Sequence, residues 1–176
     1  GSRGLGDVYK RQQLLQALLV YVEEYVTEHL HVLVPALARA IVSTDGEVRE
    51  CVDGCCRLIG QYVETAVLLH VISSAAGAGP ELPQRKAFLK VLTSVLVGSK
   101  FSGSAGNHVG EILDLISDDT ILKSEALDTC SVATELMQAL AEAAEEKFVE
   151  DDEAFEHAAL VLLQLGSQGS PSAKDA

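Results

Sequence analysis

The chain has 176 residues, with 13 Lys or Arg against 26 Asp or Glu, so its formal net charge is −13. This acidic balance and an aromatic content of only 4 Tyr, 4 Phe and no Trp argue against nucleic acid or an anionic membrane surface as a partner. Because 48% of the residues are apolar, we expect a folded protein and not a disordered acidic tail.

Apolar residues recur at helical spacing along almost the whole chain, and no segment shows the two-residue alternation of a strand. We therefore predict an all-α protein. The predicted helices cover about 8–25, 27–43, 46–63, 64–76, 82–98, 106–117, 120–141 and 152–165. Segments rich in Gly, Ser or Pro at 77–80 and 99–106 are predicted loops.

The two ends differ in composition from the rest of the chain. Residues 1–9 begin with Gly-Ser and are expected to be a cloning scar or a frayed start. Residues 166–176 contain mostly Ser, Gly, Pro, Lys, Asp and Ala and are expected to form a disordered tail. The folded array is therefore predicted to span residues 10–165.

Two apolar stripes indicate a helical hairpin. The first contains Leu30, Leu33, Val34, Leu37 and Ile41, and the second contains Val48, Cys51, Val52, Cys55, Ile59 and Tyr62. Between them lies Ser-Thr-Asp-Gly at 43–46, in which Ser or Asp can cap the second helix.

The hairpin pattern recurs along the chain. A basic residue near the start of a second helix occurs at Arg11, Arg49, Arg85 and Lys123, with separations of 38, 36 and 38 residues. A period near 37 with two helices per unit predicts a stacked α-solenoid of about four partial or complete repeats.

The segment from Leu33 to Gly60 resembles a HEAT repeat. Pro35 lies within the first helix, Asp45, Val48 and Arg49 match the turn and the second helix, and Gly60 ends the unit. In HEAT arrays, Asp and Arg of successive repeats form a stacked polar ladder. The resemblance therefore implies a structural role for Asp45, Arg49, Asp119 and Lys123.

Residues 12–72 resemble one HEAT family more specifically, that of dynein axonemal assembly factor 5. The resemblance is carried by the joint order of Leu14-Leu15, Leu18-Leu19, Glu23-Glu24, Thr27, His29-Leu30, Leu33, Val48, Cys51, Gly60, Tyr62-Val63 and Val67-Leu68-Leu69. It implies a scaffold that helps to assemble axonemal dynein arms in the cytoplasm, with dynein chains, other assembly factors or chaperones as protein partners.

The four cysteines show no metal-binding pattern. Cys51, Cys55, Cys56 and Cys130 lack the paired Cys-x-x-Cys or Cys/His spacing of a zinc site. Cys51 and Cys55 lie four residues apart among apolar side chains and are expected to be buried. This cysteine usage suits a reducing compartment.

No catalytic or cofactor-binding set emerges from the sequence. His29 and His31 point away from each other on a helix, and the remaining histidines have no nucleophile or base near them in sequence, namely His70, His108 and His157. The acidic segment 142–156 lacks the glycine of a calcium loop, and Asp151–Glu153 suit the first turn of a helix. We expect no enzyme activity, metal, cofactor or small-molecule substrate.

The outward face of the helix at 46–63 is the candidate partner-binding surface. It carries Glu47, Glu50, Asp53, Arg57 and Gln61. Second helices line the inner side of such arrays, where extended partners bind. An ordinary solvated face with an Asp53–Arg57 pair is the alternative.

Three functions remain open at this point. The first is the dynein-arm assembly scaffold that the resemblance implies. The second is a generic HEAT scaffold of the transport or phosphatase type, although the Trp-rich inner helices of transport arrays are absent. The third is a small enzyme whose site forms only in three dimensions.

Overall fold

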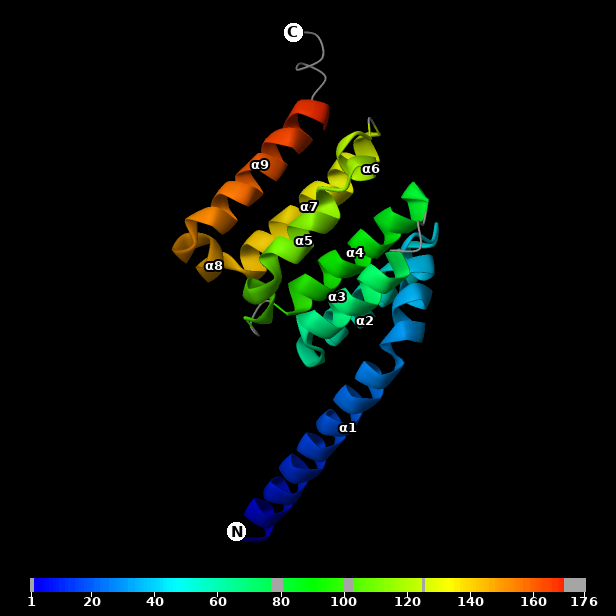
Figure 1. Ribbon diagram of the computed structural model, residues 1–176. Coiled ribbons are helices and arrows are strands. Elements are labelled where there is room, and N and C mark those ends of the chain that lie inside the picture. Colours follow the sequence, from blue (N-terminus) through cyan, green and yellow to red (C-terminus); the bar gives the residue numbers. More distant parts are fainter. Residues whose placement is uncertain (1, 77–80, 100–102, 125, 170–176) are drawn as a thin grey trace.

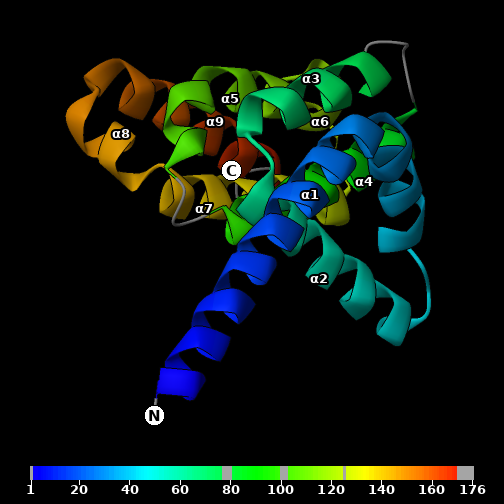
Figure 2. The ribbon, with the colours of Figure 1, turned by 90° about the horizontal axis from the view of Figure 1, so that it is seen from below.

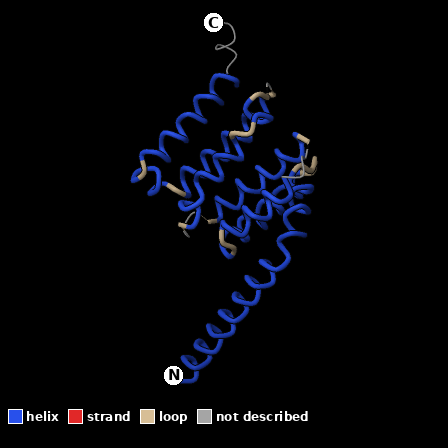
Figure 3. Tube along the Cα trace, viewed as in Figure 1, coloured by secondary structure: helices blue, strands red, loops and turns tan. Residues whose placement is uncertain are grey.

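The computed structural model describes residues 2–76, 81–99, 103–124 and 126–169, and every regular element in these ranges is a helix (Figures 1 and 3). In chain order the elements are α1 (Ser2–Ile41), α2 (Gly46–Tyr62), α3 (Thr65–Ala76), α4 (Leu82–Gly98), the 3-10 helix η1 (Ser104–His108), α5 (Val109–Ile116), α6 (Asp119–Leu122), α7 (Leu127–Ala143), α8 (Glu145–Glu150) and α9 (Asp152–Gly169). The predicted all-α array of stacked helices is confirmed.

The helices form two layers. Helices α2, α4 and α7 pack side by side in one layer, and the second half of α1, α3, α5 and α9 lie in the other. Figure 2 shows α3 and α5 above α4 and α7. Apolar side chains from both layers meet between them and are almost completely buried, including Leu30, Leu69, Leu92, Ile112 and Leu136. Burial of this apolar surface is the main force that holds the layers together.

The first two predicted helices are in fact one. Helix α1 continues from Ser2 to Ile41, so the predicted break near residue 26 is wrong. No Gly or Pro lies near that point, so nothing in the backbone ends the helix. Pro35, which lies inside α1, lacks the N–H that would bond one turn back, and the helix passes through it. Leu30, Val34 and Ala38 on the second half of α1 are buried.

The first half of α1 extends away from the two layers (Figure 1). Its apolar side chains Leu14, Leu18 and Tyr21 are 51–65% exposed. In the described residues, the second helix predicted near Arg11 is therefore the exposed first half of α1 and does not pack into the array. Residues 2–9 continue the helix, and α9 continues to Gly169, while residues 170–176 of the predicted tail lie outside the described residues.

Gly60 lies inside α2, as the predicted helix at 46–63 implies, at the point where α2 and α4 touch. A Cβ atom on Gly60 would lie 2.0 Å from the Val95 carbonyl oxygen. A Cβ atom on Gly98 would likewise lie 2.0 Å from the Arg57 carbonyl oxygen. The two backbones can approach this closely only because both positions lack a side chain.

The predicted helix at 120–141 is interrupted. Helix α6 ends at Leu122, and α7 begins at Leu127. The Ser124 hydroxyl accepts a hydrogen bond from the Ala126 N–H at 3.3 Å, a local bond that competes with continued helix. Lys123 therefore follows α6 and does not lie near the start of the second helix of a repeat. The second helices of the repeats are α2, α4 and α7, which begin at residues 46, 82 and 127. Their spacing is therefore less regular than the predicted period near 37.

The acidic segment after α7 begins with a short helix that was not predicted, α8. Asp151 then precedes α9, and its carboxylate accepts a hydrogen bond from the Ala154 N–H at 3.1 Å. Asp152 and Glu153 lie in the first turn of α9, where their charges favour the helix dipole, as expected. None of the helices in the described part of the chain combines the length and hydropathy that crossing a bilayer requires.

Candidate functional site

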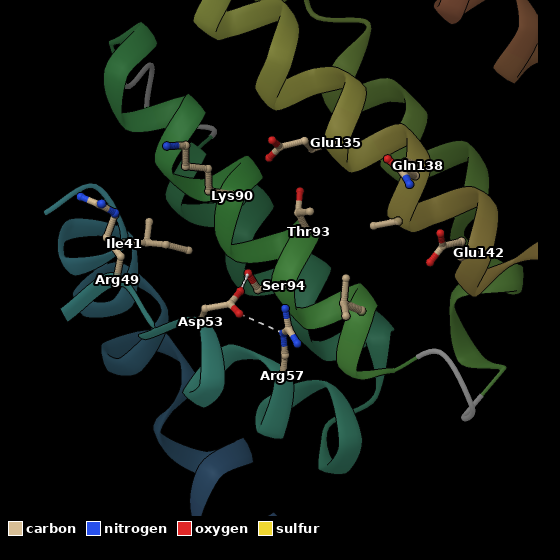
Figure 4. A pocket seen from close by; sticks show the side chains of 12 residues that line it. Ile41, Arg49, Asp53, Arg57, Lys90, Thr93, Ser94, Glu135, Gln138 and Glu142 are labelled. Carbon is tan, nitrogen blue, oxygen red and sulfur yellow. Dashed lines mark hydrogen bonds and ion pairs between the residues drawn. The ribbon is translucent and has the colours of Figure 1, made fainter. Parts of the chain in front are cut away.

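A groove of about 420 Å³ crosses the layer formed by α2, α4 and α7 (Figure 4). Its apolar lining residues are Ile41, Val97 and Ala139. The polar side chains that line it come from all three helices and comprise Arg49, Asp53, Arg57, Lys90, Thr93, Ser94, Glu135, Gln138 and Glu142. The groove is the part of the described surface where polar groups of three repeats come together.

Asp53 connects α2 to α4 at one side of the groove. Its carboxylate pairs with Arg57 Nε at 2.9 Å and accepts a hydrogen bond from the Ser94 hydroxyl, as Figure 4 shows. Ser94 is 7% exposed, so this bond is shielded from water on one side. The two bonds hold Asp53 in place and partly neutralise the charge of Arg57.

Cys56 follows Asp53 by three residues on α2, and its thiol is buried. Burial, followed by the negative charge of Asp53, raises the pKa of Cys56 to about 12. The thiol therefore stays protonated at neutral pH and is a poor nucleophile or metal ligand.

Helix α7 forms the acidic side of the groove. Glu135, Gln138 and Glu142 are spaced three and four residues apart, so they lie along one face of α7 and form a row in Figure 4. Lys90 lies opposite them on α4. A neighbouring groove of about 430 Å³ shares Lys90 and Glu135 with the first, so the hollow continues along the α4–α7 boundary.

An ion pair connects α4 and α7 near the start of both helices. The Lys86 ammonium contacts the Asp128 carboxylate, and this contact lowers the pKa of Asp128. Arg85 nearby pairs with Asp118 and donates to the Thr120 hydroxyl at 3.0 Å. These contacts connect the start of α4 to α6 and α7, so they hold successive repeats together.

The predicted partner-binding residues are only partly brought together. Asp53 and Arg57 line the groove, whereas Glu47, Glu50 and Gln61 are exposed elsewhere on α2. Sequence reasoning missed the contribution of α4 and α7 (Lys90, Thr93, Ser94, Glu135, Gln138 and Glu142). The spacing of Glu135, Gln138 and Glu142 by three and four residues could have indicated a polar face on this helix.

The predicted ladder residues make local contacts. Asp45 caps α2 by accepting from the Glu47 N–H at 2.9 Å, and Arg49 donates to the Ser43 carbonyl oxygen at 2.7 Å. Asp119 pairs with Lys123 across one turn at 3.2 Å. A ladder that joins these pairs between repeats remains a prediction.

The prediction that Cys51 and Cys55 are buried is wrong, because both are exposed. The buried face of α2 is formed by Val52, Cys56 and Ile59, which lies one residue further around the helix. Cys56 and Cys130 are buried. No set of three or more His, Cys, Asp and Glu side chains in the described ranges is arranged to hold a metal ion.

The histidines make separate contacts. His29 stacks on Tyr25 with ring centroids 4.3 Å apart, and His108 lies 3.4 Å from the Glu111 carboxylate. His157 lies 4.0 Å from Asp114 and joins α9 to α5. These contacts place the three rings in different parts of the surface.

Comparison with known protein families identifies the array. Residues 6–163 match the HEAT-repeat domain of dynein axonemal assembly factor 5, which covers both layers and the groove. Neither a curated protein nor a solved structure matches the chain. The chain therefore belongs to the dynein axonemal assembly factor 5 family and contains its HEAT-repeat domain.

Proposed function

We propose that this protein is a non-catalytic scaffold for the assembly of axonemal dynein arms. It binds dynein chains, or the assembly factors and chaperones that act on them, through the groove across α2, α4 and α7. Assembly at this stage takes place in the cytoplasm, before the arms reach the axoneme. The observation that carries the proposal is the match of residues 6–163 to the assembly-factor family.

The shape and charge of the groove support protein binding. It is open, crosses three repeats and presents charged side chains of both signs, which suits a polypeptide surface. A net charge of −13 also favours association with basic protein surfaces.

The proposal is tested by changing the groove in a ciliated cell that carries the gene. Replacement by the double variant Glu135→Lys with Glu142→Lys reverses two charges on the wall of α7. We expect outer and inner dynein arms to be lost from axoneme cross-sections while the microtubules remain, as in a strain that lacks the gene.

The matched control is Glu146→Lys with Glu150→Lys, which makes the same charge change on exposed positions of α8. This control should keep its arms. Both variant proteins are purified and compared with the wild type by circular dichroism, so that a folding defect is recognised. Normal arms in a cell with a folded, normally abundant groove variant would contradict the proposal.

A further inference from the structure

The groove continues past α7 into an apolar hollow of about 640 Å³ between α7, α8 and α9. The two spaces share Gln138 and Glu142, so these side chains lie on the ridge between them. Beyond the ridge the lining is mainly apolar and includes Phe148, Val149, Phe155 and Leu162. The chemistry of the surface therefore changes abruptly at α7.

The apolar side chains of the hollow are unusually open to solvent. Val149 is 77% exposed, Phe155 is 60% exposed and Leu162 is 48% exposed. Grouped exposed apolar side chains beside a polar rim are typical of a protein-binding surface. Residues 166–176 contain no large apolar side chain that could fill the hollow. An apolar side chain of a partner protein fits this hollow.

The charges of the groove follow a definite order. On the α2 and α4 side lie Arg57, which is partly neutralised by Asp53, and Lys90. On α7 lie Glu135 and Glu142. From α2 toward α9 the surface is therefore basic, then acidic, then apolar. A complementary partner presents acidic, basic and apolar side chains in the same order.

The length of the path limits the partner segment. Neighbouring packed helices lie roughly 8–10 Å apart, so a path along the surface from α2 over α4 and α7 to α9, which packs on α7 from the other layer, covers roughly 24–30 Å. An extended chain advances about 3.3 Å per residue, so about seven to nine residues cross this distance. We propose that the groove and hollow together bind an extended segment of a partner protein, about nine residues long, with an acidic part, a basic part and a large apolar residue in that order from α2 to α9. The inference deepens the proposed function by naming the chemistry of its partner.

The test uses two labelled peptides of about nine residues and the purified chain. One carries two Glu, then two Lys, then a final Phe, with Ser and Ala between them. The other has Glu and Lys exchanged and is otherwise identical. By fluorescence anisotropy at low salt, the first peptide should bind at least about tenfold more tightly than the second. Equal affinities, or no binding of either peptide, would overturn the inference.

Two variants test the parts separately. Phe155→Glu should weaken binding of the first peptide at least about tenfold by placing a charge in the hollow. Leu160→Glu is its control, because Leu160 is 60% exposed on the same helix but does not line the hollow, and it should bind as the wild type does. Glu135→Lys with Glu142→Lys makes both sides of the groove basic, so it should abolish the preference between the peptides, and an unchanged preference would overturn the assigned order of charges.

Two further outcomes would also overturn the inference. One is self-association of the chain that Phe155→Glu abolishes in sedimentation, because a second copy would then occupy the hollow. The other is loss of peptide binding in a longer protein of the family, because a neighbouring segment would then cover it. If neither peptide binds but the groove variant loses its dynein arms, only this inference is rejected. Peptide binding with normal arms would instead reject the proposed function.

Discussion

The boundary between α2 and α4 and the boundary between α4 and α7 are built differently. At the first, Gly60 and Gly98 allow the two backbones to touch. At the second, the larger side chains of Lys90 and Glu135 line a groove that remains open at the surface. The same helix, α4, takes part in both. The absence of a side chain therefore lets the first pair of helices close on each other, while long polar side chains leave a groove along the second.

The largest expected effect breaks the close contact between α2 and α4. In Gly60→Ala the new methyl group would lie 2.0 Å from the Val95 carbonyl oxygen, so the helices must move apart. We expect the free energy of unfolding to fall by about 3 kcal/mol, measured by urea denaturation.

Gly54→Ala is the matched control on the same helix. No atom lies within 4 Å of a Cβ at Gly54. Because Ala favours helix over Gly, this variant should be more stable than the wild type by up to about 1 kcal/mol. If Gly60→Ala were as stable as Gly54→Ala, the backbone contact between α2 and α4 would be excluded.

A smaller effect is expected when the side-chain bond between α2 and α4 is removed. Ser94→Ala deletes the hydroxyl that donates to Asp53 and leaves the Arg57 pair in place. Since the bond is partly buried, the free energy of unfolding should fall by about 1 kcal/mol. Ser131→Ala, at an exposed position of α7, should change it by less than about 0.5 kcal/mol. Equal losses in both variants would show that the Ser94–Asp53 bond adds no stability.

The smallest effect concerns the contacts between α4 and α6. The hydrogen bond from the Thr120 hydroxyl, with Arg85 behind it, lowers the pKa of Asp118 below its ordinary value of 3.8. The folded state therefore binds this proton more weakly than the unfolded state. The resulting stability is present above pH 3.8 and is lost as the pH falls through the lower, folded value.

This dependence is measured by thermal unfolding between pH 7 and acid pH. Asp118→Asn should lower the midpoint at pH 7 and flatten its decline below about pH 4. Asp119→Asn is the neighbouring control, because the Asp119 carboxylate pairs with Lys123, one turn further along the chain, and not with a residue of α4. The effect should be small because Asp118 is partly exposed and its ion pair is screened by water. If the unfolding midpoint of Asp118→Asn fell with pH as that of the wild type does, Asp118 would not contribute to the loss of stability in acid.

Much of the fold follows from local pattern. The spacing of apolar residues predicted helices at 82–98 with the observed bounds and at 46–63 within one residue. Turn residues also acted locally, since Asp45 caps α2 where the sequence indicated. The break between α6 and α7 was missed because it depends on the weaker signal of Ser124, whose hydroxyl competes for a backbone N–H.

The candidate site was predicted less completely than the fold. Asp53 and Arg57 were found because they share one helix face four residues apart. Ser94 and Glu142 were missed because they lie 41 and 89 residues after Asp53 in the chain and reach the groove only when three hairpins stack. The burial of Cys56 in place of Cys55 was missed for a related reason, since α2 packs against both α1 and α4.

By itself the sequence determined that this protein is an acidic, all-helical array with the signature of the dynein axonemal assembly factor 5 family. Those features depend on composition and on contacts within one hairpin, which repeat along the chain. Only the tertiary structure decided that Gly60 is the point where α2 contacts α4, and that Glu135 and Glu142 of α7 line one groove with Lys90 of α4. Both depend on the distance and angle between helices of different repeats, which are set by how whole layers pack.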